Sequence, residues 1–378
     1  MRTLERVLLV SNAPGLGIEE GLIAEFSRHG IAVEVIYRSD SRTFFDKYII
    51  RTTNKLLHNL RIQPKSERKF EQHPLSYRNY SESNLIKKVA EYAPDLILLL
   101  RGHRRTIQTL LTIKERAKLY GWWLEGEEDC MEQVPAEIAC FDWYFFLSQR
   151  CVEVMQEQGH PHTSYQHHVV NFDMFRPPSP AALAVGKRYD LCFVGKWSEK
   201  RQQYLEAALK VTSNIAVYGP KWRAKNLTNW SVLSCIKGNS IFGEALVALY
   251  RQSAIVINIT GWEGGQAQKR SGMNMRVLEV PVCGAFLLTD TSIETENILT
   301  PGLHVGSYED LADFQAKLVY YLAHPEVCAR IAQAGMAHIR EKNISYAPFV
   351  DRIMQIYQSG ETLHPGCVRD PLENMCMG

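Results

Sequence analysis

Residues 272–290 read GMNMRVLEVPVCGAFLLTD and carry the strongest pattern in this 378-residue chain. A glycine-led turn precedes a predicted helix that holds Arg276 and Glu279, and an apolar strand follows. Such a turn leaves backbone N–H groups unpaired at the positive end of the helix dipole, where a diphosphate can bind. We expect Arg276, one turn into the helix, to donate to phosphate oxygens, and Glu279 to accept hydrogen bonds from a ribose diol. The stretch therefore predicts a binding site for a nucleoside diphosphate.

Alternating strand and helix patterns on both sides of this stretch predict an α/β protein. The length exceeds the roughly 250 to 300 residues at which a single core stops growing, so we expect two domains. RVLLVS, IEEGLIAEFSRHG and AVEVIY predict a parallel βαβ unit, and NLIKKVAEYA, DLILLL, TIQTLLTIKERAKLYG, WWL and WYFFLS continue the alternation. After an irregular, proline-rich stretch that includes RPPSPAA, further strands are predicted at RYDLCFVG, NIAVYG, AIVINI and AFLLTD, with helices at KRQQYLEAALK, FGEALVALYRQ, 311–323, 325–341 and 347–359.

Composition excludes several classes of protein. A net charge of +2 argues against a nucleic-acid partner, and no nucleic-acid motif is present. Nine cysteines without a C-x-x-C pair indicate reduced thiols in a cytoplasmic protein and no zinc site. The apolar run at residues 7–10 is too short for a signal sequence or a membrane span. The basic segment 41–84 leaves room for at most peripheral membrane contact.

The motif G-M-N-x-R-x-x-E, followed by C-G-A and a strand ending in T-D, resembles the donor-binding motif of GT-B glycosyltransferases of the CgeB-like (spore maturation protein) group. The resemblance extends through YEDL, LVYYLAHPE and IAQAGMAHI, and back through YDLCFVGKWSEKR and AVYGPKW. The first half matches more loosely, through APDLILLLRG, WWLEGEED and HHVVNFDMFRP. Two departures are Ser271, where many relatives have a glutamate, and Pro281, where relatives have a helix-forming residue.

This resemblance implies a GT-B fold, in which two Rossmann-like domains face each other across a cleft and a C-terminal helix crosses back. We expect an acceptor-binding domain at 1–172, a linker at 173–187, a nucleotide-sugar-binding domain at 188–345, and the crossing helix and tail at 346–378. The implied activity is that of a hexosyltransferase-type glycosyltransferase, with a UDP- or GDP-type sugar as co-substrate and no cofactor. The acceptor is left open between a glycan, a lipid-linked, a protein and a small-molecule hydroxyl.

Residues that follow three other segments complete the predicted donor site. Lys196, Lys200 and Arg201 come just after a strand that ends near Gly195, at the carboxyl edge where open α/β sheets bind ligands. Cations there suit a diphosphate leaving group. Loops at AVYGPKW and IKGNSIF are candidates to hold the base. The predicted donor set is Gly195, Lys196, Arg201, Gly219, Trp222, Gly238, Gly272, Asn274, Arg276 and Glu279.

In the first domain, four acidic residues, 125 and 127–129, follow the predicted strand WWL. A carboxylate at such an edge can deprotonate an acceptor hydroxyl if the reaction inverts configuration. CgeB-like relatives tend to carry an acidic residue after this tryptophan, and the resemblance therefore implies a catalytic role for Glu125. Arg276 is the second residue that we expect to be catalytic. A plain solvated loop is the other interpretation of these acids. Further acceptor or cleft candidates, which ordinary surface loops would also explain, are Gly15, Arg101, His103 and Asp129.

The sequence favours metal-independent chemistry, because it has no D-x-D triplet and Arg276, Lys196 and Arg201 can neutralise the diphosphate. The histidines at 160–168 lack zinc-like spacing, so no metal site is predicted. A lone G-x-G near the N-terminus does not make an NAD site. Two alternatives stay open: a nucleotide-sugar epimerase of the same architecture, and a non-catalytic nucleotide-binding scaffold protein, which Ser271 and Pro281 would suit.

Overall fold

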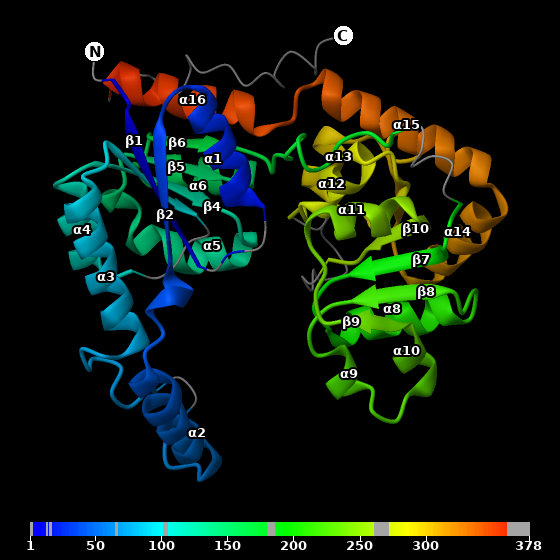
Figure 1. The fold of residues 1–378 in the computed structure, drawn as a ribbon, viewed down its shortest axis with the longest axis horizontal. Helices are drawn as coiled ribbons and strands as arrows, with labels where there is room; N and C mark the ends of the chain where they lie inside the picture. The colour runs from blue at the N-terminus through cyan, green and yellow to red at the C-terminus, as the bar shows by residue number, and fades with distance from the viewer. Residues whose placement is uncertain are drawn as a thin grey trace. The chain divides into compact units, whose positions relative to one another are not determined.

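The computed structural model describes residues 3–12, 14, 17–64, 67–100, 105–179, 186–260 and 272–360. These residues divide into two compact units. One unit holds most of the chain up to Gln166 together with the residues from Val350 onward, and the other holds His167–Phe349, with the start of the first helix up to Gly21 grouped with it. Each unit is built on one parallel six-stranded sheet (Figure 1), which confirms the predicted α/β class.

The first unit has the strand order β2-β1-β3-β4-β5-β6. The strands β1 and β3–β5 are almost entirely buried, as expected for a parallel sheet that is covered on both faces. Its elements are β1 (Arg6–Ser11), α1 (Ile18–Arg28), β2 (Ala32–Tyr37), η1 (Arg38–Ser41), η2 (Phe45–Ile50), α2 (Arg51–Asn59), α3 (Tyr77–Tyr92), β3 (Leu96–Leu100), α4 (Ile107–Lys114), β4 (Lys118–Trp123), α5 (Glu127–Gln133), η3 (Val134–Ala136), η4 (Ile138–Cys140), β5 (Trp143–Phe146), α6 (Gln149–Glu157), β6 (Thr163–Tyr165) and most of α16 (Tyr346–Ser359).

The second unit has the order β12-β11-β10-β7-β8-β9. The order changes direction between β7 and β10, which makes the carboxyl ends of these two strands the switch point where such sheets bind ligands. Its elements are β7 (Tyr189–Val194), α8 (Glu199–Leu209), β8 (Ile215–Tyr218), α9 (Trp222–Lys225), α10 (Trp230–Cys235), β9 (Ile236–Gly238), α11 (Gly243–Arg251), β10 (Ser253–Asn258), α12 (Arg276–Val282), β11 (Leu287–Asp290), α13 (Ile293–Ile298), β12 (Gly306–Tyr308), α14 (Leu311–Ala323) and α15 (Pro325–Glu341).

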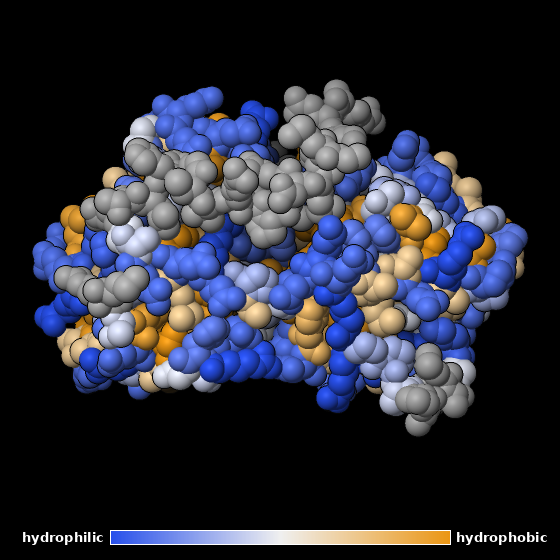
Figure 2. All heavy atoms as spheres, turned by 90° about the horizontal axis from the view of Figure 1, so that it is seen from above, coloured by the Kyte–Doolittle hydropathy of each residue, from blue (hydrophilic) through white to orange (hydrophobic). Residues whose placement is uncertain are grey.

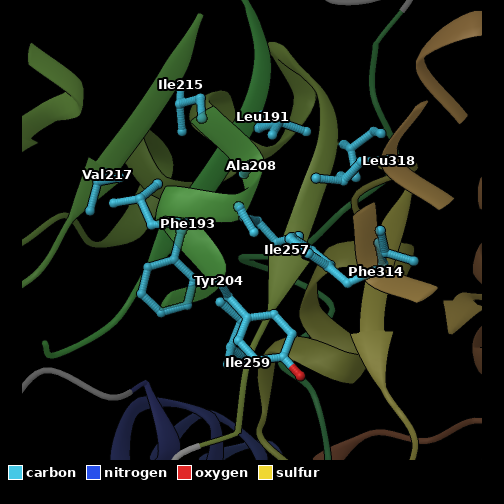
Figure 3. Close-up of a cluster of buried hydrophobic side chains, with 14 of the residues drawn as sticks. Leu191, Phe193, Tyr204, Ala208, Ile215, Val217, Ile257, Ile259, Phe314 and Leu318 are labelled. Atoms are coloured by element: carbon cyan, nitrogen blue, oxygen red, sulfur yellow. The ribbon is translucent and has the colours of Figure 1, made fainter. Parts of the chain in front are cut away.

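A hydrophobic cluster on one face of the second sheet fixes these strand ends (Figure 3). Phe193 of β7 and Ile257 of β10 point toward Tyr204 of α8 and Phe314 of α14, and all four are buried. Burying a side chain of this size contributes about 1.5 to 3 kcal/mol. This packed cluster therefore supports the carboxyl ends of β7 and β10, where the candidate site lies.

Most long elements agree with the sequence prediction, but the short ones do not. The strands β6, β9 and β12 were not predicted, and each has only three residues. The helix predicted over TIQTLLTIKERAKLYG ends at Lys114, because residues from Lys118 onward pair with β3 and begin β4. Phe175, which lies in the predicted linker 173–187, packs in the core of the second unit, and the main segment of that unit begins at His167.

The described part of the chain contains no helix that is long and apolar enough to cross a membrane. In the face shown by Figure 2, hydrophilic residues cover most of the described surface and hydrophobic ones are scattered among them.

Candidate functional site

The candidate site of the second unit begins at Arg276, the first residue of α12. Its guanidinium donates one hydrogen bond of 2.6 Å to the side-chain oxygen of Asn258, at the end of β10, and another to the backbone oxygen of Val194, at the end of β7. Its Nε is buried and has no partner among the described residues. The sequence placed Arg276 one turn into the helix. The structure places it at the helix start, above the switch point of the sheet.

Asn258 organises this arrangement, and the sequence analysis did not single it out. Its side chain is fully buried. Its Oδ1 accepts from Arg276 and, at 2.9 Å, from Nδ2 of Asn274, while its own Nδ2 donates to Thr289 at 3.0 Å. Its backbone oxygen accepts from the hydroxyl of Tyr308 at 2.7 Å. The one available signal was an amide at the end of the apolar run AIVIN, where a buried polar group requires partners.

Arg201 supplies a second guanidinium at the same sheet edge. Ser198 caps α8 by accepting from the Arg201 backbone N–H. The Arg201 side chain donates to the backbone oxygens of Ile259 at 3.0 Å and Lys196 at 2.9 Å. Burial, and then the positive charge of Arg276, lower the pKa of Arg201 to about 10. Two partly buried cations that raise each other's energy form a site that favours an anion.

The two neighbouring lysines differ in what they contact. Lys196 is exposed just beyond β7. Lys200 instead donates to the backbone oxygen of Thr260 at 3.1 Å and lies 3.5 Å from the buried carboxylate of Asp290. The structure therefore gives Lys200 a role in joining α8 to the ends of β10 and β11.

The glycines after β7 and β8 bring two loops into contact. A Cβ on Gly219, whose φ is +155°, would overlap the backbone oxygen of Gly195. The Gly219 N–H donates to the backbone oxygen of Gly238 at 3.0 Å. Trp222 is fully buried, and its indole N–H donates to the Gly195 oxygen at 2.8 Å. This corrects the prediction for Trp222. Its ring has no exposed face on which a base could stack, and its indole N–H instead supports the Gly195 loop.

The turn before α12 differs in one respect from the prediction. The N–H of Gly272, whose φ is +108°, donates to the buried carboxylate of Glu294 at 2.6 Å, so this amide is already occupied. The backbone N–H groups of Asn274, Met275 and Arg276 donate no hydrogen bond to any described residue. The predicted unpaired amides therefore lie two to four residues later in the chain.

Glu279 lies on α12, one turn after Arg276, and only 9% of its surface is exposed. Burial raises the pKa of its carboxyl to about 7, and the charge of Arg276 opposes this rise. No hydrogen bond joins this carboxyl to the described part of the chain. Pro281 occupies the end of the same helix, which has only seven residues.

In the first unit, Glu125 is exposed in the loop between β4 and α5. Its neighbour Glu127 accepts a hydrogen bond of 3.1 Å from Ser148 and lies 3.3 Å from Nε of Arg150, so it joins α5 to α6. Asp129 lies within α5. Four residues that the sequence singled out lie outside the described residues: Gly15, Arg101, His103 and Ser271.

Comparisons with known proteins agree with this fold. The fold matches HepE of Anabaena in complex with UDP and glucose, with a TM-score of 0.61, 12% identity, and coverage of 94% of this chain and 100% of that one. It also matches sucrose-phosphate synthase from Thermosynechococcus elongatus, with a TM-score of 0.64, 10% identity, and coverage of 94% and 98%.

Residues 200–355 match the model of the glycosyl transferase-like family. Over 265 residues the chain is 23% identical to the spore protein CgeB of Bacillus subtilis (strain 168), which covers 67% of this chain and 80% of that protein. These matches confirm the resemblance to CgeB and the GT-B fold. The glycosyl transferase-like match includes Arg201, Asn258, Arg276 and Glu279, so the whole cluster around α12 lies within the part of the chain that this family model matches.

Proposed function

We propose that this chain is a hexosyltransferase-type glycosyltransferase that moves a sugar from a nucleoside-diphosphate sugar to an acceptor hydroxyl. The observation that carries the proposal is the pair of partly buried guanidiniums, Arg276 and Arg201, held at the switch point of the second sheet. When the sugar leaves, the departing diphosphate gains one negative charge in addition to the two that it carries in the donor, and preorganised cations stabilise this charge as it develops.

Each part of the cluster then has a role. Arg276, Arg201 and the exposed Lys196 bind the diphosphate, and the amides of residues 274–276 add hydrogen bonds at the start of α12. Glu279, ionised when ligand is bound, accepts from the ribose hydroxyls. The loop at Gly219 and Gly238 lies beside the base. The fold shared with HepE, which was solved with UDP and glucose, supports a UDP-type donor.

In the reaction, the bond between the anomeric carbon and the diphosphate oxygen breaks, and its electron pair stays with the diphosphate. The acceptor oxygen bonds to the anomeric carbon, and its proton passes to a base. We assign that base to Glu125 for an inverting reaction, because it is an exposed carboxylate just beyond the carboxyl end of β4. The cations of the second unit supply the charge neutralisation that a divalent ion provides in other enzymes, so activity should persist in EDTA.

A direct test is the release of nucleoside diphosphate from a panel of UDP-, GDP- and ADP-sugars, with and without glycan, lipid-linked, peptide and small-molecule acceptors. The wild type should release diphosphate in an acceptor-dependent way. Arg276→Ala should lose this activity, and Arg330→Ala, an exposed arginine on α15, should keep it.

Other outcomes would select the alternatives. A change in the sugar without release of diphosphate would indicate an epimerase. Nucleotide binding without turnover of any donor would indicate a non-catalytic scaffold, and equal activity in Arg276→Ala would contradict the proposed role of this cluster.

A further inference from the structure

Residues 42–75, here called the arm, join η1 to α3 and include η2 and α2. The arm contains eight lysines and arginines but three acidic residues, a net charge of +5 in a chain whose total is +2. Figure 1 shows α2 extending away from the sheet of the first unit. The proposed donor site uses none of these residues.

The interior of the arm is polar. Asn54 and Gln63 are its buried centre, and Nε2 of Gln63 donates to Oδ1 of Asn54 at 3.0 Å. The same oxygen accepts from the backbone N–H of Lys69 at 2.7 Å. Asp46, also buried, accepts from the backbone N–H of Tyr77 at 2.9 Å and so ties the arm to α3. Hydrogen bonds between polar groups therefore help to hold this segment together.

The large apolar side chains of the arm lie on its outside. Phe44 is 75% exposed and Ile62 is 66% exposed. Few monomeric proteins gather so many exposed apolar side chains in one short segment unless the surface binds something. The exposed apolar residues of the arm are Phe44, Tyr48, Ile49, Leu56, Leu60, Ile62, Phe70 and Leu75.

Lysines and arginines outnumber acidic residues in the arm. None of its described lysines or arginines forms an ion pair with a described carboxylate. Arg42, Arg51, Lys55 and Arg68 line a cavity of about 540 Å³ next to Tyr77. Basic residues around a cavity, with apolar residues beside them, are suited to a phosphate headgroup and the acyl boundary beneath it.

We propose that the arm binds the surface of an anionic lipid bilayer. An amphipathic helix with a basic polar face and exposed Phe, Tyr, Ile and Leu is the pattern of helices that lie in the membrane interface. A second copy of the chain is a poorer partner, because a symmetric contact between two arms would bring two surfaces of +5 together. A nucleic acid would leave the apolar side chains without a partner.

The test is sedimentation of the full chain with vesicles of phosphatidylcholine alone and of phosphatidylcholine with phosphatidylglycerol. The wild type should bind the anionic vesicles at least tenfold more strongly, and added salt should weaken binding. Arg51→Ala/Lys55→Ala should reduce binding by roughly 30-fold, since each basic residue near a membrane surface contributes about 1 kcal/mol. Leu56→Ser/Leu60→Ser should also weaken binding.

Leu227→Ser/Trp230→Ser is the matched control, because these two residues are even more exposed than Leu56 and Leu60 but lie in the second unit. This variant should bind as the wild type does, and circular dichroism and a thermal melt establish that each variant is folded. Equal binding to neutral and anionic vesicles, or equal losses in the arm and control variants, would overturn the proposal. So would a wild-type dimer that the arm variants convert to a monomer without any binding to vesicles.

Discussion

The buried carboxyl of Glu279 should make the second unit less stable as the pH rises from 4.5 to 7. Burial raises its pKa from the ordinary value of 4.5 to about 7 in the folded state. Between these two values the folded state keeps a proton that the unfolded state has lost, so raising the pH favours unfolding. Below pH 4.5 both states are protonated, and above pH 7 both are ionised.

The size of the effect follows from the two pKa values. At about 1.4 kcal/mol for each pH unit between them, ionisation of Glu279 costs about 3 kcal/mol of folding free energy. Glu279→Gln removes the titration and keeps a neutral side chain of nearly the same shape. The variant should therefore gain stability relative to the wild type across this range, until it is about 3 kcal/mol more stable near pH 7.

The measurement is urea unfolding of both proteins at closely spaced pH values from 4.5 to 8. Taking the difference between their unfolding free energies cancels every other titrating group. If the two units unfold separately, only the transition of the second unit should shift, and the first provides an internal control. Glu341→Gln, an exposed glutamate at the end of α15, should give a flat difference. A flat difference for Glu279→Gln would refute the reasoning.

Three further predictions follow from the same site. If the ribose binds ionised Glu279, nucleotide affinity measured by calorimetry should be about tenfold higher at pH 8 than at pH 6, and Glu279→Gln should abolish this dependence. Asn258→Ala should lower the free energy of unfolding in urea by about 2 to 3 kcal/mol and weaken nucleotide binding, because Arg276 and Asn274 lose their acceptor. An unchanged nucleotide affinity would show that Asn258 does not position Arg276. Gly219→Ala should lower the melting temperature more than Gly302→Ala does. Both glycines have a positive φ, but only at Gly219 would a Cβ overlap the backbone of another residue. Equal shifts in the melting temperature of the two variants would contradict this contact.

The sequence predicted the fold well where apolar patterns are long. The strands β1, β3, β7, β10 and β11 and the helices α14 and α15 appear where their patterns place them. The strands β6, β9 and β12 were missed because three residues cannot show an alternation, and their pairing with a neighbouring strand decides their conformation.

The local part of the site was also predictable, since Asn274, Arg276 and Glu279 share one turn and helix. Contacts between distant segments were not. Arg276 contacts both Asn258 and Val194 because the strands that end at these residues, β10 and β7, are neighbours in the sheet. Trp222 was predicted to contact a base, but the sequence of a loop does not tell which way an aromatic side chain turns, and here it packs into the core.

The most direct test of the donor site is thermal unfolding of the purified protein with UDP, GDP, ADP and CMP and their sugar conjugates. A ligand at about 100 times its dissociation constant adds about 2.7 kcal/mol of stability, which for a unit of this size raises the melting temperature by roughly 5 to 10 °C. We expect one nucleotide to shift the wild type and to leave Glu279→Ala unshifted. No shift from any nucleotide, in a protein that melts cooperatively, would contradict the central claim, as would an equal shift in both proteins.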